Sequence, residues 1–329
     1  MDVIFITGHR KSGTSVFHKL FERHPDLNSF PVDLSVFYAY FPGFVSQSAS
    51  ATKKRDRINK VLTKCTASLR GQVPVGGTRA FDCQRFLASL HAGLKDENLG
   101  SRSVLLRQML ESFGECCGFM RNRTWVVKET SQAIYAADFL ADGMNIRFIN
   151  LLRDPRDNYA ALKAGVEGYY LAFGEDEMKT LASLVNRSRM DFLASRTLSE
   201  RFRDRLLTVR FEDLCADTDT TMRNISTFCG ISFDQSLLTP TFLGQSYSGN
   251  SHDGRIFRGL SSENVGRWPE RISEKEAMII EFWMHDVMQN FGYQLAHDLQ
   301  RSAEAFADFY TWYNGTYFFH DSFAEPASP

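Results

Sequence analysis

Four short apolar segments, separated by stretches of helical periodicity, restrict the fold of this chain more than any other feature. They cover residues 3–7, 124–127, 147–152 and 206–211, and each contains β-branched or aromatic residues. Runs of this length and composition are typical of buried strands. Strands that alternate with helices pair in parallel, because the chain returns to the same end of the sheet through each helix. We therefore expect an α/β fold with a doubly wound parallel sheet flanked by helices.

Charged residues follow three of these segments directly. Lys128 follows the second segment, Arg153 the third and Glu212 the fourth. The carboxyl ends of parallel strands lie at one edge of the sheet, and open α/β sheets bind their ligands beyond that edge. We therefore expect these side chains to meet at one site.

The overall charge excludes whole classes of partner. The chain of 329 residues has 38 Lys and Arg against 39 Asp and Glu. No global field then draws it to nucleic acid or to an anionic membrane, so a site for an anion must be local. No apolar run approaches the ~20 residues of a membrane span, and the first run is too short for a signal peptide. We expect a cytoplasmic protein.

The remaining regions give weaker signals. The six cysteines lack CxxC spacing, which favours reduced, structural thiols and no metal site. We expect one domain over residues 1–329, with a helical insertion around 43–114 and an aromatic extension around 294–329. The insertion either has a solvated face or forms a lid, and the extension serves packing or the interface of a homodimer. The spacing of apolar residues predicts a long amphipathic helix over 273–291.

The loop after the first apolar segment carries the clearest motif. It reads Gly8-His-Arg-Lys-Ser-Gly-Thr-Ser15 and precedes a helical pattern, so its N–H groups and the helix dipole favour an anion. A P-loop of the GxxxxGK[ST] type has Lys after the second glycine, where this chain has Thr14. The lysine stands inside the loop as Lys11. This position suits a short phosphosulfate better than a triphosphate. A nucleotide kinase or NTPase, and a basic turn that only caps a helix, remain the alternatives.

The same loop resembles the 5′-phosphosulfate loop of sulfotransferases that use 3′-phosphoadenosine-5′-phosphosulfate (PAPS). Three further segments resemble motifs of this family in the family's order. Residues 151–157 (Leu-Leu-Arg-Asp-Pro-Arg-Asp) are similar to its 3′-phosphate motif, 209–214 to a later strand end, and 265–268 (Val-Gly-Arg-Trp) to its carboxyl-terminal nucleotide segment. The resemblance covers most of the chain, from residue 3 to about 293. It implies a soluble protein with the P-loop-like sulfotransferase fold.

The resemblance also implies an activity. The chain would transfer a sulfuryl group from PAPS to a hydroxyl or amine of a small-molecule acceptor and release adenosine 3′,5′-bisphosphate (PAP), without a metal. Lys11 matches the lysine that contacts the oxygen between phosphorus and sulfur, where a cation stabilises the leaving group. The 5′-phosphate would be held by the remaining residues of the loop, which are Arg10, Ser12, Gly13, Thr14 and Ser15.

Further residues are candidates for nucleotide binding because of their resemblance to the family. Arg153 matches the arginine that binds the 3′-phosphate, which its planar fork suits. The family usually has a serine eight residues later, where this chain has Ala161, and Asn158 is our candidate to replace it. Phe211 either stacks on adenine or belongs to the core. Two arginines are candidates for a basic residue that reaches the nucleotide from the carboxyl-terminal loop, Arg267 and Arg258.

Catalysis needs a group that takes the acceptor's proton. Many cytosolic members have His two residues after the lysine that ends the second strand, and this chain has Thr130 there. Other members use a carboxylate shortly after the first helix, so we expect Asp33 to be the base, with Glu129 in reserve and Lys128 on the transferring group. Asp33 as a helix cap, and Lys128 as a structural lysine, are the alternatives. The missing His also leaves open a catalytically silent nucleotide-binding scaffold.

Overall fold

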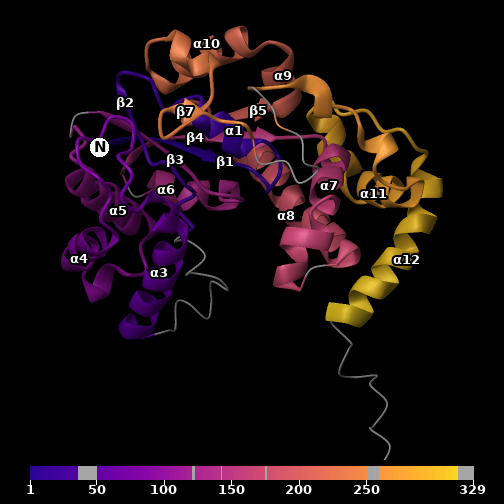
Figure 1. The fold of residues 1–329 in the computed structure, drawn as a ribbon. Helices are drawn as coiled ribbons and strands as arrows, with labels where there is room; N and C mark the ends of the chain where they lie inside the picture. Colours follow the sequence, from indigo (N-terminus) through magenta and orange to yellow (C-terminus); the bar gives the residue numbers. More distant parts are fainter. Residues whose placement is uncertain are drawn as a thin grey trace, which may run out of the picture.

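The structure is a computed structural model, and it describes residues 1–35, 50–120, 123–141, 143–174, 176–249, 256 and 259–317. Its centre is a sheet of five parallel strands in the order β2-β3-β1-β4-β5 (Figure 1). The strands are β1 (Asp2–Thr7), β2 (Leu27–Ser29), β3 (Thr124–Lys128), β4 (Asn145–Leu152) and β5 (Leu206–Arg210). The predicted parallel α/β sheet is therefore confirmed, with the four apolar segments as β1, β3, β4 and β5.

The central strand β1 supplies both faces of the sheet with core side chains. Val3 and Phe5 belong to one buried cluster, and Ile4 and Ile6 belong to another. This alternation follows from the two-residue period of a strand. Because helices cover both faces, the strand is apolar at successive positions instead of alternating with polar residues.

Helices pack on the two faces. One face is covered by α3 (Ala51–Thr66), α4 (Cys83–Gly93), α5 (Arg102–Cys117) and α6 (Ala136–Ala141). The other is covered by α1 (Thr14–Lys19), α9 (Phe211–Ala216) and α10 (Thr218–Cys229). Figure 1 shows these two layers below and above the sheet. A short antiparallel hairpin, β6 (Thr241–Phe242) with β7 (Gln245–Ser246), follows α10.

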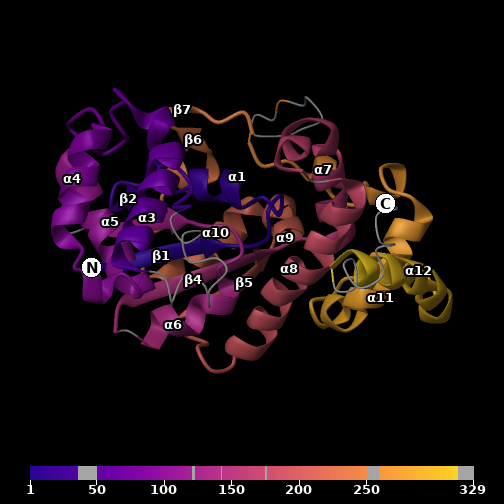
Figure 2. The ribbon, with the colours of Figure 1, turned by 90° about the horizontal axis from the view of Figure 1, so that it is seen from below.

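A third group of helices has its own core beside β5. It consists of α7 (Pro155–Lys163), α8 (Glu177–Leu198), α11 (Glu274–Asn290) and α12 (Leu299–Tyr317). Figure 2 shows α11 and α12 at the end of the molecule opposite α4 and α5. The predicted amphipathic helix is α11, which begins with a capping box formed by Ser273 and Glu276. From the aromatic segment after residue 294, helix α12 packs on it, with Phe306 stacked on Trp283 at 5.1 Å between ring centres.

No helix in the described part of the chain is both long enough and apolar enough to cross a membrane.

Candidate active site

The loop between β1 and α1 depends on two glycines. Gly8 has φ 149°, and a Cβ there would lie 2.3 Å from the carbonyl oxygen of Leu151. Gly13 has φ 95°, and its Cβ would lie 2.4 Å from the ring of Phe211. Side chains rarely adopt such φ values and no side chain fits these spaces, so both positions require glycine. The loop is thus pressed against the ends of β4 and β5.

Buried polar side chains fix the backbone of the loop through hydrogen bonds. Ser12 Oγ donates to the carbonyl of His9 at 2.6 Å. Asn158 Nδ2 donates to the carbonyl of Arg10 at 2.8 Å, and its Oδ1 lies 2.8 Å from His9 Nδ1. Burial, with help from the charge of Arg187, lowers the pKa of His9 to about 3, so the ring is neutral. In the structure Asn158 therefore positions the loop, and its expected contact with a phosphate stays a prediction.

Arg153 joins the loop to a distant segment of the chain. It follows β4, and its two terminal nitrogens donate to the carbonyls of Lys11 at 2.9 Å and Asn264 at 2.8 Å. Its guanidinium also lies 5.0 Å from the centre of the Phe211 ring. Three of the motifs found in the sequence therefore meet at this one arginine, with the segment around Asn264 beside them.

Asp157 holds the fourth motif in place. Its carboxylate accepts hydrogen bonds from the backbone N–H of Gly266 at 2.5 Å and of Trp268 at 2.8 Å. Arg267 lies between these residues, and its side chain pairs with Glu270 at 2.9 Å. The other predicted arginine of this region, Arg258, lies outside the described residues.

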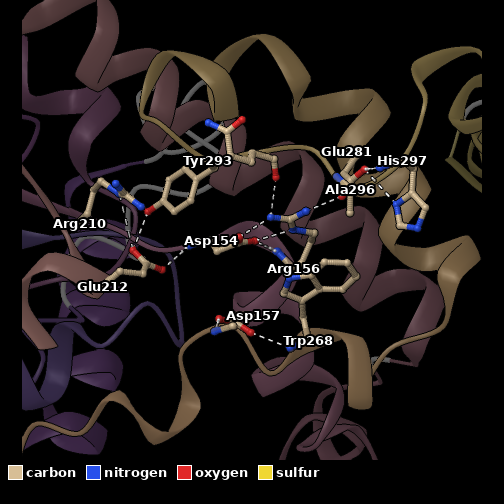
Figure 3. Close-up of polar contacts among 12 residues, drawn as sticks. Asp154, Arg156, Asp157, Arg210, Glu212, Trp268, Glu281, Tyr293, Ala296 and His297 are labelled. Atoms are coloured by element: carbon tan, nitrogen blue, oxygen red, sulfur yellow. Dashed lines mark hydrogen bonds and ion pairs between the residues drawn. The ribbon is translucent and has the colours of Figure 1, made fainter. Parts of the chain in front are cut away.

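A buried network fixes the start of α7 against α11 (Figure 3). Arg156 pairs with Asp154 at 2.7 Å and with Glu281 of α11 at 2.5 Å. Glu212 accepts hydrogen bonds from the backbone N–H of Asp154 at 2.8 Å and from the hydroxyl of Tyr293 at 2.9 Å. Sequence reasoning gave Arg156 no separate role, although a Pro-Arg step at a helix start beside a strand end was the available signal.

Arg10 reaches away from the turn of the loop. Its Nη2 donates to Ser183 Oγ of α8 at 3.2 Å, and its guanidinium lies 4.7 Å from the centre of the Tyr170 ring. Thr14 is buried at the first position of α1. The side chains of Arg10 and Thr14, which were predicted to surround a phosphate, are therefore occupied by contacts within the protein.

A second group of predicted residues meets at the ends of α1 and β3. Lys128 Nζ donates to Ser15 Oγ at 3.0 Å and lies 2.7 Å and 2.8 Å from the two carboxylate oxygens of Asp33. The side chain of Lys128 is 4% exposed and that of Asp33 is 43% exposed. The three side chains come from a helix, a strand end and a loop, as expected for the carboxyl edge of a parallel sheet. The alternative role of Asp33, as the cap of a helix from Leu34 onward, falls mainly on residues 36–49, which lie outside the described residues.

Glu129 lies buried next to this group. Its Oε1 accepts a hydrogen bond from the backbone N–H of Thr130 at 2.8 Å. Its Oε2 has no hydrogen-bond partner among the described residues. Burial and then the charge of Asp33 raise the pKa of Glu129 to about 8. The carboxyl group therefore carries a proton at neutral pH.

A pocket of about 330 Å³ lies beside Lys128, and we call it the Lys128 pocket. Its walls include Ser15, Asp33 and Lys128 together with Lys19 of α1 and two aromatic residues of the hairpin region, Phe242 and Tyr247. Sequence reasoning missed Lys19 and this hairpin. The available signal was the spacing of Lys19, four residues after Ser15, which places both on one face of a helix.

Buried contacts fix Lys19 in this wall. Its Nζ donates to the carbonyl of Pro31 and lies 4.3 Å from the centre of the Phe242 ring. Burial lowers the pKa of Lys19 to about 8, an effect that Glu22 opposes. Glu22 in turn accepts a hydrogen bond from the backbone N–H of Leu243 at 2.7 Å, so it anchors the hairpin over the pocket.

In the described ranges, no three His, Cys, Asp or Glu side chains gather where they could hold a metal ion.

Comparison with known proteins identifies the family. The sequence profile of the sulfotransferase family matches residues 3–235, which is more than half of the chain. A search of curated proteins returned no significant match. Among solved structures, the sulfotransferase domain from the curacin biosynthetic pathway is similar with a TM-score of 0.54 and 14% identity, covering 89% of this chain and 98% of that one.

Two further solved structures are similar at TM-scores of 0.46. The sulfotransferase domain of the Synechococcus PCC 7002 olefin synthase has 18% identity and covers 94% of each chain. A mouse sulfotransferase complexed with PAP has 13% identity and covers 88% of this chain and 85% of that one. Because the profile spans the loop, β3, the 151–157 motif and β5, and the curacin domain shares the fold, this chain belongs to the sulfotransferase family.

Proposed function

We propose that this chain transfers a sulfuryl group from PAPS to a hydroxyl or amine of a small-molecule acceptor. The observation that carries the proposal is the position of Lys128, which contacts Ser15 at the end of the anion-binding loop and Asp33 at the mouth of the pocket. A donor held by the loop and an acceptor held in the pocket would meet at this lysine.

The residues around the loop suit a nucleotide with two separate phosphate groups. Lys11 and the backbone of 10–15 would hold the 5′-phosphosulfate. Arg153 would bind the 3′-phosphate, since a guanidinium has five N–H donors and two of its nitrogens serve backbone carbonyls here. Its Nε is buried without a partner among the described residues, which supports a role toward a ligand. Phe211 and Arg267 would contact the nucleotide from the neighbouring wall.

Asp33 is the group that suits proton transfer. Lys128 holds its carboxylate in place through the ion pair at 2.7 Å, and the side chain of Asp33 is exposed enough to reach an acceptor. Glu129 is less suited, because its raised pKa leaves it protonated at neutral pH. The acceptor oxygen or nitrogen forms a bond to sulfur, the bond between sulfur and the phosphate oxygen breaks, and Asp33 receives the acceptor's proton while PAP keeps the electron pair.

Lys128 then links proton transfer to sulfuryl transfer. While Asp33 is ionised, Lys128 is attracted to it across 2.7 Å. Once Asp33 is protonated this attraction falls, and the ammonium becomes available to the negative charge on the sulfuryl oxygens and the leaving phosphate. Lys11 would stabilise the same leaving charge from the loop side.

Incubation with ³⁵S-labelled PAPS and pools of hydroxylated and aminated metabolites, followed by mass spectrometry, tests the proposal. We expect a sulfated product from the wild type, and none from Asp33→Asn or Lys128→Met although both variants still bind PAP in calorimetry. Tighter binding of ATP than of PAP would instead support a kinase or NTPase. PAP binding with no product from any pool would support a silent scaffold, and failure of both tests would refute the proposal.

A further inference from the structure

Among the described residues, the pocket wall contains two lysines, Lys19 and Lys128, but one carboxylate, Asp33. This part of the wall therefore has one more positive than negative side chain, and the unbalanced charge is that of Lys19. Of the charged side chains in the wall, Asp33 is paired with Lys128 at 2.7 Å. The carboxylate that most offsets the charge of Lys19 is Glu22, but its oxygens accept hydrogen bonds from the backbone N–H groups of Leu243 at 2.7 Å and Gly244 at 3.4 Å. A buried cation whose nearest carboxylate serves other donors is stabilised by an added anion.

The ammonium of Lys19 still has donors to offer. The carbonyl of Pro31 takes one of its three N–H groups. Phe242 contacts the cation through the face of its ring at 4.3 Å, which uses no N–H group. Within the described part of the chain, this leaves room for a ligand oxygen on the pocket side of Lys19.

The position of Lys19 places such an oxygen away from the transfer point. Ser15 contacts Lys128, and Lys19 stands four residues further along α1. Along the helix axis the backbone positions of Ser15 and Lys19 lie about 6 Å apart, so the two side chains belong to successive turns. Aromatic side chains, Phe242 and Tyr247, line the wall beside Lys19. An acceptor that contacts both Lys19 and the transfer point would have a compact apolar body between two polar ends.

Resting on the proposed function, we propose that Lys19 binds a carboxylate of the acceptor, so that the chain acts on small hydroxy or amino acids whose carboxylate lies at the opposite end of the molecule from the atom that is sulfated. Lys19 is then a specificity-determining residue and takes no part in the bond changes.

A matched pair of acceptors tests this inference. 4-Hydroxybenzoate and 4-hydroxybenzamide have the same ring and hydroxyl, and only the first carries a charge. A charge-assisted hydrogen bond should make kcat/KM of the wild type about tenfold to a hundredfold higher for the acid. Lys19→Met keeps the length and apolar contacts of the side chain, and should lower kcat/KM for the acid to that of the amide while the amide changes by less than about threefold.

Lys60→Met is the control, because Lys60 is exposed on α3 outside the pocket and its loss should leave both acceptors unchanged. Calorimetric binding of the two compounds to the PAP-saturated protein gives a second measurement. A wild type without preference for the acid in rate or binding, including one that binds neither compound, would overturn the inference. So would an equal loss for both acceptors in Lys19→Met, which indicates a structural role. The proposed function is judged separately by PAP binding and by transfer to the metabolite pools.

Discussion

Replacing Asp157 with asparagine should release the 265–268 segment from the start of α7. The carboxylate accepts two backbone hydrogen bonds, from Gly266 at 2.5 Å and Trp268 at 2.8 Å. Asparagine has one acceptor oxygen and would place its NH₂ group against the second N–H. Hydrogen bonds to a charged group are worth about 1.5–3 kcal/mol each, and a neutral one about 0.5–1.5 kcal/mol. Burial raises the pKa of Asp157, because removing the charged carboxylate from water offsets part of the stabilisation from these hydrogen bonds. The net loss should be about 2–4 kcal/mol.

This loss converts to a measurable change in melting temperature. With an unfolding entropy of about 2.1 cal/mol/K per residue and 329 residues, the melting temperature of the variant should be about 3–6 °C lower than that of the wild type. Differential scanning calorimetry would measure it, and titration with PAP should show weaker binding because the backbone on either side of Arg267 is no longer held. Asp219→Asn is the control, since Asp219 forms an exposed ion pair with Arg223 and its loss should cost about 1 °C or less. If Asp157→Asn lowers the melting temperature no more than this control, Asp157 does not hold the segment.

Three further predictions concern the loop and the pocket. Lys11→Ala should abolish sulfuryl transfer with an unchanged circular dichroism spectrum, and an active variant would remove Lys11 from the mechanism. Gly13→Ala should destabilise the fold by about 2 kcal/mol or more, because its Cβ would lie 2.4 Å from the Phe211 ring at a φ of 95°; chemical denaturation measures this, and an unchanged midpoint would contradict the packing. The pKa of Glu129 is raised from 4.5 to about 8, so the folded chain keeps a proton that the unfolded chain loses, and this group lowers stability as pH rises from about 4.5 to 8. Glu129→Gln should therefore gain stability relative to the wild type toward pH 8, by up to about 1.4 kcal/mol per pH unit, and an equal difference at pH 5 and pH 8 would argue against the shift.

In the five-stranded sheet, the sequence predicted the four strands that carry apolar runs and missed β2, which carries none. Strand β2 is Leu27-Asn-Ser, and it exists because it pairs with β3 at the edge of the sheet. Two of its three residues are polar, so neither composition nor periodicity distinguishes it from a loop. Asp33 follows this missed strand, so its position near Lys128 was expected from the resemblance to sulfotransferases and not from the rule for strand ends.

Other parts of the site depend on contacts that no local pattern encodes. Lys19 on an amphipathic helix would ordinarily be a surface residue, and it is buried because the hairpin with Phe242 folds over it from more than 200 positions later. Asn158 was the candidate to replace the serine that is absent at position 161, but its amide is used by His9 and the carbonyl of Arg10. The roles of Lys19 and Asn158 depend on contacts between distant segments, so they could be assigned only from the tertiary structure.

A crystal structure of the chain with PAP would test the central claim most directly, which is that the loop and the Lys128 pocket form one donor and acceptor site. We expect the 5′-phosphate within hydrogen-bond distance of the backbone of residues 10–15, the 3′-phosphate on Arg153, and the side chains of Lys128 and Asp33 beside the 5′-phosphate. PAP bound elsewhere, or bound with both phosphates away from the loop and Arg153, would contradict the account.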